Sequence, residues 1–375
     1  MKERVSQALN LGRLSYGPLS QEFENRFAQM HGCKYGVLSN SGTSSLLVAL
    51  QTLKELHGWQ DGDEILAPSV TFVASINTII QNRLAPVLID IDEYLTIDCD
   101  LIEHHITPKT KGIMPVHLFG QPADMPRIMA IADKYNLKVV EDSCEAAFAT
   151  IDKGSIDWWG DIGCHSFYMA HIITCGVGGI GITKNPDYAN KMRSLANHAL
   201  SYDYLTKSEA FDPMMLSRHF VFDSIGHSMR ITELESALGL AQLDDWQSLV
   251  SKRVNNFCYL SNALQPLVDS GKIELLKTRG NATFCPMMFP ITIIPETKYK
   301  IMNYLTSKGI GTRDALPLTN QPAYKNIFVE SHYPRAQYIN NHCFYVGIHQ
   351  HLTTSDLDFI AQSMFDFYDN FDREG

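Results

Sequence analysis

The sequence predicts an α/β protein with a mostly parallel sheet, helices on both of its faces, and a smaller α/β domain after it. Short apolar, β-rich runs alternate with amphipathic segments from Tyr35 to Thr183, as in parallel strands joined by helical crossovers. Beyond about residue 250 the alternation gives way to mixed elements. At 375 residues the chain also exceeds the usual length of a single core. We therefore expect a large domain over 1–250 and a small domain over 251–375.

Seven strands are expected in the large domain. Between them, residues 43–56 carry Leu46, Leu50 and Leu53 at helical spacing. Asp124 stands two residues before Pro126, and an aspartate at this place predicts the cap of a helix. The expected strands cover 36–39, 64–67, 87–91, 112–116, 138–141, 165–168 and 179–183.

A long apolar helix is expected over 231–249, long enough to pass from one domain to the other. The small domain should then contain two further helices, a strand and a terminal helix that begins at Ser355. The first three of these elements are expected at 254–267 (helix), 289–294 (strand) and 298–308 (helix).

Composition excludes several classes of function. The formal charge is −10 and the Lys and Arg residues are scattered, which argues against nucleic acid and against an anionic membrane surface as partners. No apolar run approaches the roughly 20 residues of a membrane span, and the N-terminus lacks a secretory signal, so we expect a soluble, cytoplasmic protein. The eight cysteines show no C-x-x-C pair, and the histidine pairs at 104–105 and 349–351 lack further ligands. Neither a metal site nor an iron–sulfur cluster is therefore expected.

A turn rich in Ser, Thr and Gly follows the first strand and opens the helix at 43–56. Gly42 lets the backbone approach a ligand closely. The unpaired N–H groups of this helix start, which includes Thr43 and Ser44, favour a phosphate. The same residue types also form an ordinary helix cap, and both interpretations stay open.

Four further positions are candidate ligand contacts. The strand at 138–141 runs into an acidic stretch with Asp142 and Glu145, and the C-terminal ends of strands line the ligand crevice of such sheets. Phe72 follows another strand end and could lie flat on a ring, and the hydroxyl of Ser166 could bind phosphate. Their alternatives are a helix-capping aspartate, a core phenylalanine and a plain strand serine.

Taken together, these residues resemble the fold-type-I family of sugar aminotransferases and dehydratases (DegT-like), which use pyridoxal or pyridoxamine phosphate. The resemblance implies an aspartate-aminotransferase-like three-layer sandwich and a homodimer with shared active sites. It further implies that Gly42, Thr43, Ser44 and Ser166 bind the phosphate. Phe72 would stack on the ring and Asp142 would pair with the pyridinium. The matching motifs lie, in order, at 17–18, 41–43, 68–72, 117–120, 141–142, 166–179 and 237–243.

His171 stands where this family carries the lysine that forms a Schiff base with pyridoxal phosphate. Histidine at this position is typical of the sugar-nucleotide 3-dehydratase branch, which the stretches 311–313, 319–324, 345–348 and 352–354 also resemble. Arg313 and Asn320 in these stretches are candidate substrate contacts.

Two positions depart from the family pattern, and the cysteine spacing indicates which subgroup of the dehydratases this chain resembles. Val177 stands where the family usually has Glu, and Ser228 stands where Asn is frequent. Ser228 is nevertheless the expected contact to the phosphate of the neighbouring subunit. One subgroup of dehydratases binds an iron–sulfur cluster on closely spaced cysteines. Without such spacing, this chain is more similar to the cluster-free subgroup.

The resemblance implies a dehydratase that removes the 3-hydroxyl of a nucleotide-linked 4-keto-6-deoxyhexose. His171 would be the proton-transfer group, and glutamate would be the amino donor. A side chain with an ordinary pKa of about 6.5 suits acid and base roles near neutral pH. Two alternatives stay open: an aminotransferase, including one whose lysine has been replaced, and a cofactor-binding relative without turnover.

Overall fold

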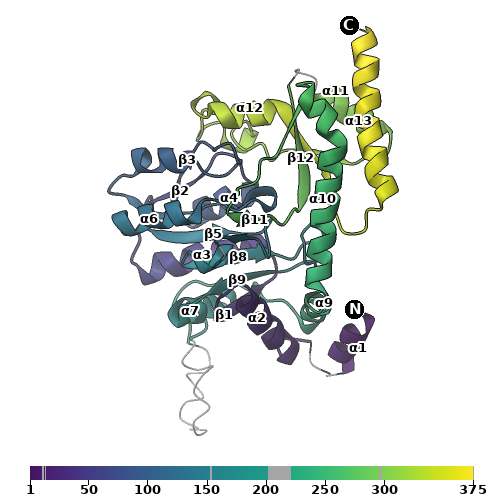
Figure 1. Ribbon diagram of the computed structural model, residues 1–375. Coiled ribbons are helices and arrows are strands. Elements are labelled where there is room, and N and C mark those ends of the chain that lie inside the picture. The colour runs from purple at the N-terminus through teal and green to yellow at the C-terminus, as the bar shows by residue number, and fades with distance from the viewer. Residues whose placement is uncertain (11, 13, 153, 202–220, 295–297, 375) are drawn as a thin grey trace, which may run out of the picture.

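A seven-stranded sheet forms the centre of the larger part of the chain in the computed structural model (Figure 1). The structure describes residues 1–375 except 11, 13, 153, 202–220, 295–297 and 375. Strand β9 runs antiparallel to both of its neighbours, and the other neighbouring pairs are parallel. In spatial order the strands are β1 (Tyr35–Ser39), β9 (Gly179–Thr183), β8 (Ile162–Ser166), β5 (Lys138–Asp142), β4 (Thr110–Ile113), β2 (Glu64–Pro68) and β3 (Ala85–Ile89).

Alternate residues of the strands face different cores, which makes the sheet the middle of three layers. Val140 packs in one cluster with α3 and α4, whereas its neighbour Val139 packs in another with α6. Period-two alternation of this kind buries both faces of a sheet. The helices that flank the sheet, with the short α5, are α2 (Pro18–Met30), α3 (Gly42–Leu56), α4 (Val73–Gln81), α5 (Cys99–Ile102), α6 (Met125–Tyr135) and α7 (Pro186–Ala196). The first helix, α1 (Lys2–Asn10), packs instead on α9 (Glu233–Leu243).

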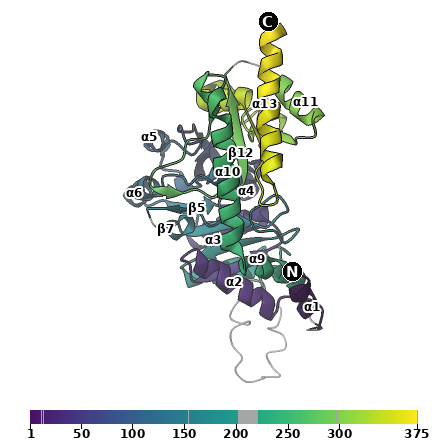
Figure 2. The same cartoon turned by 45° about the vertical axis from the view of Figure 1, so that its right-hand side comes forward.

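The prediction of one continuous helix over 231–249 is wrong. α9 (Glu233–Leu243) ends at Asp244, and a separate helix, α10 (Trp246–Asp269), begins after Asp245. Asp245 leaves the helical conformation at φ −130° and precedes the first turn of α10. α10 is the helix that passes between the two parts of the chain (Figure 2), and it contains the helix expected at 254–267. The division at residue 250 falls inside α10 and stays a prediction.

An antiparallel sheet forms the smaller part of the chain. Its order is β10 (Ile273–Leu275), β12 (Met288–Ile293), β14 (Cys343–Gly347) and β13 (Thr312–Asp314). It packs with α11 (Lys298–Ser307), α12 (Pro334–His342) and α13 (Thr354–Glu374), and α13 lies beside α10 (Figure 2). The remaining short elements are β6 (Thr150–Ile151), β7 (Gly154–Ser155), β11 (Ala282–Thr283), η1 (Glu103–His105), η2 (Leu118–Gly120), η3 (Ile156–Trp158), η5 (Pro322–Tyr324) and η6 (Glu330–His332).

Most expected elements are confirmed, with shifts at strand ends. The strands expected at 87–91, 112–116 and 165–168 begin and end two to three residues earlier, as β3, β4 and β8. In each case buried residues continue past the last paired residue, so an apolar run extends beyond the strand itself. None of the helices in the described part of the chain is both long and apolar enough to cross a bilayer.

Candidate active site

The carboxyl ends of β2, β5 and β8 bring three predicted site residues to one edge of the sheet, and a fourth, Gly42, follows the end of β1, which runs in the same direction. Asp142 is the last residue of β5 and Ser166 the last of β8. Phe72 follows β2 as the cap residue of α4, and Gly42 begins α3. Since β2, β5 and β8 run in the same direction, their ends share the edge at which ligands bind in such sheets.

The start of α3 lies against Ser166. A Cβ atom on Gly42 would come within 2.7 Å of the Ser166 Cβ and 2.8 Å of the Cys144 Sγ, so only glycine fits here. Ser41 caps the helix by accepting a hydrogen bond from the Ser44 N–H at 3.0 Å, which confirms that this turn is a cap. The first N–H groups of a helix lack acceptors within it, so the capped turn remains suited to an anion.

Asp142 is a buried carboxyl group that makes no ion pair within the described residues. It is 5% exposed, and its Oδ2 accepts a 2.7 Å hydrogen bond from the Ser75 hydroxyl. The Cys144 N–H donates to Oδ1 at 3.2 Å. Burial raises the pKa of Asp142, and the hydrogen bonds from Ser75 and Cys144 partly oppose this. A buried carboxylate normally has a cationic partner, and a protonated pyridine nitrogen would supply one.

Phe72 is not a core residue, because 55% of it is exposed. The interpretation as a core phenylalanine is therefore wrong. The turn that carries it is tied to the base of the site: Thr71 and Ser75 share a 2.7 Å hydrogen bond, and Ser75 donates to Asp142. An exposed aromatic face next to a buried carboxyl group fits a planar, nitrogen-containing ring.

His171 lies in the loop between β8 and β9, and its side chain is half-buried. Its N–H donates to the Tyr168 carbonyl at 2.9 Å. Its Nδ1 is buried and has no hydrogen-bond partner among the described residues. Burial lowers the pKa of His171 to about 4. The main-chain carbonyl of Cys144 opposes this decrease, whereas the charges of His165 and Arg253 contribute to it. The imidazole is therefore neutral near pH 7 and only weakly basic without a ligand.

Glu145 joins the site from the turn after β5. It accepts a hydrogen bond from the Phe119 N–H at 2.9 Å, and burial raises its pKa to about 7. Tyr345 of β14 lies close enough that the charges of Glu145 and Arg313 influence its pKa. The pairing of Arg313 with Tyr345 across β13 and β14 brings this edge of the small sheet toward Glu145.

Ser228 and Asn320 are two further predicted site residues, and both are exposed. Ser228 is exposed and forms an isolated antiparallel β-bridge with Asn197. The carbonyl of Met229, which follows Ser228, accepts a 2.7 Å hydrogen bond from the Asn40 N–H, just before α3. Asn320 is exposed, in a segment that docks on α4 through a 2.7 Å hydrogen bond from the Tyr324 hydroxyl to Asn77. The roles of both residues stay predictions.

A buried cluster of His31, Asp157 and His165 has a composition that could suit a metal ion. His31 already uses both ring nitrogens, at 2.8 Å to the Phe27 carbonyl and 3.2 Å to the Phe148 N–H. His165 Nε2 lies 2.9 Å from Asp157 Oδ2. The cluster is therefore a hydrogen-bonded network within the core, beneath β8.

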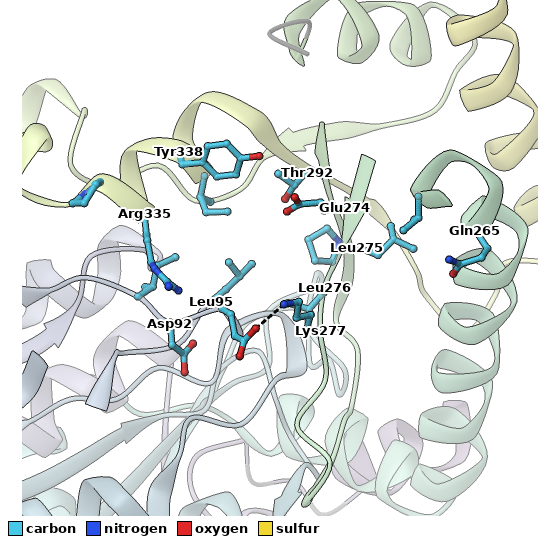
Figure 3. Close-up of a pocket in the computed structure, with 16 residues that line it drawn as sticks. Asp92, Leu95, Gln265, Glu274, Leu275, Leu276, Lys277, Thr292, Arg335 and Tyr338 are labelled. Carbon is cyan, nitrogen blue, oxygen red and sulfur yellow. Dashed lines mark hydrogen bonds and ion pairs between the residues drawn. The ribbon is translucent and has the colours of Figure 1, made fainter. Parts of the chain in front are cut away.

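The cavity in Figure 3, of about 730 Å³, lies away from the strand ends described above. It is bounded by the loop after β3, by β10 and by α12, and none of the predicted site residues lines it. Its Lys277 is paired with Glu93 at 2.6 Å, and its Asp92 is paired with Arg279. The charges around this cavity are thus largely neutralised already, unlike the Asp142 carboxyl group.

Comparison with known proteins places the chain in a family. The model of the DegT/DnrJ/EryC1/StrS aminotransferase family matches residues 1–365. The chain belongs to this family. The lipopolysaccharide biosynthesis protein RfbH of Salmonella typhimurium is 31% identical over 95% of this chain and 86% of its own length. The GDP-perosamine synthase of Caulobacter vibrioides is 32% identical over 84% of this chain and 80% of its own length.

Solved structures of similar proteins confirm the aminotransferase-like fold. The aminotransferase from Psychrobacter cryohalolentis superimposes with a TM-score of 0.90 at 27% identity, over 98% of this chain and 96% of its own. The GDP-4-keto-6-deoxy-D-mannose-3-dehydratase of E. coli gives 0.88 at 23% identity, over 96% and 95%. The DegT family comprises sugar-modifying enzymes whose cofactor is pyridoxal 5′-phosphate or its pyridoxamine form.

Ser75 and Tyr345 are residues near the site that the sequence analysis did not predict. Thr71 and Ser75 are four residues apart at the start of a helix, a spacing that places them together, so their link to each other was accessible from the sequence. The contact of Ser75 with Asp142 spans 67 residues, and the approach of Tyr345 to Glu145 spans even more. No local sequence pattern indicates contacts between residues so far apart in the chain.

Proposed function

We propose that this chain is a dehydratase that removes the 3-hydroxyl of a nucleotide-linked 4-keto-6-deoxyhexose with pyridoxamine phosphate as cofactor. The observation that carries the proposal is His171, a neutral and half-buried imidazole, which by resemblance stands at the position of the lysine of the aminotransferases. An imidazole transfers protons but cannot form the covalent link that a lysine amine makes. The site is therefore suited to elimination.

The residues at the strand ends suit the cofactor. The first turn of α3 (42–44) and Ser166 would bind its phosphate, Phe72 would cover its ring, and Asp142 would pair with the ring nitrogen. When bound, the cofactor supplies an amino group and a ring that accepts electrons. The buried carboxyl group of Asp142, which lacks a cationic partner among the described residues, supports this assignment.

His171 would take a proton and return it. Its low pKa leaves the imidazole deprotonated near pH 7, and an anionic ligand beside it would raise that pKa toward neutrality. Acid and base catalysis are most effective when the pKa lies near the working pH. His171 thus gains basicity only when the site is filled.

The substrate class, the amino donor and the assembly extend this proposal. Arg313 and Asn320 would contact the sugar nucleotide, and Glu145 would lie beside the cofactor. Ser228 would reach the phosphate of the second copy in a homodimer. Glutamate would donate the amino group. The names of GDP-perosamine synthase and of the GDP-sugar 3-dehydratase support a nucleotide-linked sugar as substrate.

An aminotransferase is the second candidate, supported by the description of the family and by the GDP-perosamine synthase. In that case His171 would stand in place of a lysine. The product of the parent chain separates the two candidates, because a dehydratase forms a 3-deoxy sugar and an aminotransferase forms an amino sugar. Under either candidate, His171→Lys should make the cofactor covalently reducible onto the chain.

The test of the proposed function uses His171→Asn with His342→Asn on α12 as the matched control. Cofactor affinity, followed by absorbance, should stay near that of the parent chain, because the phosphate and ring contacts lie elsewhere. Formation of the 3-deoxy sugar, followed by mass spectrometry, should fall by roughly 10²-fold or more. Turnover at the parent rate would refute the role of His171. Borohydride should leave the cofactor unattached in both proteins.

A further inference from the structure

Two main-chain hydrogen bonds close the loop that carries His171 at its base. The Phe167 N–H donates to the Gly178 carbonyl and the Cys175 N–H donates to the Phe167 carbonyl, both at 2.8 Å. Ile172 and Ile173, each 1% exposed, anchor the loop in the core. Within the loop, the His171 N–H donates to the Tyr168 carbonyl at 2.9 Å. Apolar packing is not directional, so polar contacts from other elements add to what positions the His171 main chain.

Gln242 of α9 provides the first such contact. Its Oε1 accepts a hydrogen bond from the Thr174 N–H at 3.1 Å, and its Nε2 donates to the Thr174 carbonyl. The same Nε2 donates to the Leu238 carbonyl at 3.0 Å within α9. A carboxamide offers one acceptor and a donor that match the N–H and the C=O of a single residue, so this pair fixes the two peptide groups on either side of the Thr174 Cα.

Arg253 of α10 provides the second contact. It is 3% exposed, and among the described residues no carboxylate pairs with it. One terminal nitrogen donates to the carbonyls of Pro286 and Met287 at 3.3 and 3.1 Å, and Nε donates to Gln350 at 3.0 Å. The other terminal nitrogen reaches the His171 carbonyl at 3.5 Å. A buried cation without a counter-ion is costly, and this one is held solely by neutral acceptors.

We propose that Gln242 and Arg253 are positioning residues for His171. Gln242 fixes the loop three residues beyond it, while Arg253 binds its carbonyl and keeps a positive charge beside it, which favours the neutral imidazole. The two residues belong to α9 and α10, on either side of the helix break at Asp244 and Asp245. The inference rests on the proposed function, in which His171 transfers the proton.

The groups that act on the His171 imidazole come from three elements. His165 of β8 and Arg253 of α10 both lower its pKa, in addition to burial, and the carbonyl of Cys144 after β5 opposes them. Removal of the Arg253 charge should therefore raise the pKa of His171. Because the base form exists only above that pKa, the acid limb of the pH–rate profile should move to higher pH.

The first test measures His171 without substrate or cofactor, by NMR titration of labelled imidazole, with His171→Asn to assign the signal. Arg253→Met should raise the pKa of His171 by about one unit, whereas Arg253→Lys, which keeps the charge, should not. Lys252→Met is the matched control, because it removes an exposed charge one residue earlier. Arg253→Gln gives the same neutral test if Arg253→Met does not fold. An Arg253 effect no larger than that of Lys252→Met would overturn the electrostatic role.

The second test measures the loop itself. Gln242→Leu should speed hydrogen exchange of the Thr174 amide by about tenfold, the loss expected for one hydrogen bond, while Gln265→Leu on α10 should leave it unchanged. With substrate, Gln242→Leu should lower kcat more than it raises KM. Unchanged Thr174 exchange in Gln242→Leu would overturn the positioning role. A parent chain with the expected His171 titration but without turnover would refute the proposed function and leave this inference standing.

Discussion

At the scale of single residues, burial sets the protonation state of the candidate site. It raises the pKa of Asp142 and Glu145 and lowers that of His171, in each case because a buried charge loses its hydration. The empty site thus favours neutral groups. A ligand that brings both a cation and anions would restore the charged forms, so ligand binding and protonation should be coupled.

Glu145 offers a direct test of this coupling in the protein without ligand. Its pKa of about 7 in the folded chain lies above the ordinary 4.5. Folding therefore favours the protonated form, and the stability that this contributes is present below pH 4.5 and is lost as the pH rises to 7. Glu145→Gln keeps an acceptor for the Phe119 N–H and removes the titration. Relative to the parent, the variant should gain stability between pH 5 and 8, on the order of 3 kcal/mol.

Urea unfolding at pH 5 and pH 8 measures that gain. Glu3→Gln on the exposed face of α1 is the control, and its stability relative to the parent should not change between the two pH values. A difference between Glu145→Gln and the parent that is independent of pH would mean that Glu145 is already ionised in the folded chain.

At the scale of elements, local patterns predict helices and strands well where they agree with tertiary contacts. The helix at 43–56 and the aspartate cap at Asp124 were accessible because the stop and start signals are local. The break between α9 and α10 was not, since Asp244 and Asp245 are ordinary residues on a helix surface. In the structure, Asp244 at this break pairs with Arg26 of α2 at 2.9 Å, a contact that the local sequence does not indicate.

Glu233 shows how one element completes another. Its buried carboxylate accepts hydrogen bonds from the N–H groups of Gly17, Leu19 and Ser20, each at 2.9 Å, at the start of α2. Glu233→Ala would leave these main-chain donors buried without acceptors, which should cost about 3 kcal/mol or more in stability. Denaturant unfolding measures the loss.

Glu235→Ala is the matched comparison, two residues further along α9. It removes only the local capping box with Thr232, for a loss of about 1 kcal/mol. Equal losses for the two variants would show that the contact of Glu233 with α2 adds nothing beyond the local cap.

At the scale of the whole molecule, the sequence predicted which strand ends meet but not what holds them. Asp142, Phe72 and Ser166 each follow or end an apolar strand, so a parallel sheet places them at one edge. The contact of Arg253 with the His171 loop spans 82 residues. A single arginine on a helix carries no local sign that it will be buried. Residues that position a site residue from a distant part of the chain can therefore be identified only in the structure.

The surface around His171 bears on assembly. Tyr168, Met169 and Val177 are 57%, 65% and 51% exposed and all belong to the His171 loop. Exposed apolar side chains gathered on one segment are typical of an interaction surface. Because each copy carries a formal charge of −10, association should strengthen as salt screens the repulsion.

We therefore expect a homodimer that Met169→Asp dissociates, since a charge would be buried where an apolar side chain was covered. Phe359→Asp on α13, at an equally exposed phenylalanine (50%), should leave the dimer intact. Sedimentation at about 0.15 M and at lower salt measures both. Cofactor affinity should fall together with dimerisation in Met169→Asp, because the second copy would complete the phosphate site through Ser228. A monomeric parent chain that binds the cofactor at full affinity would contradict the shared site, and each chain would then hold a complete site of its own.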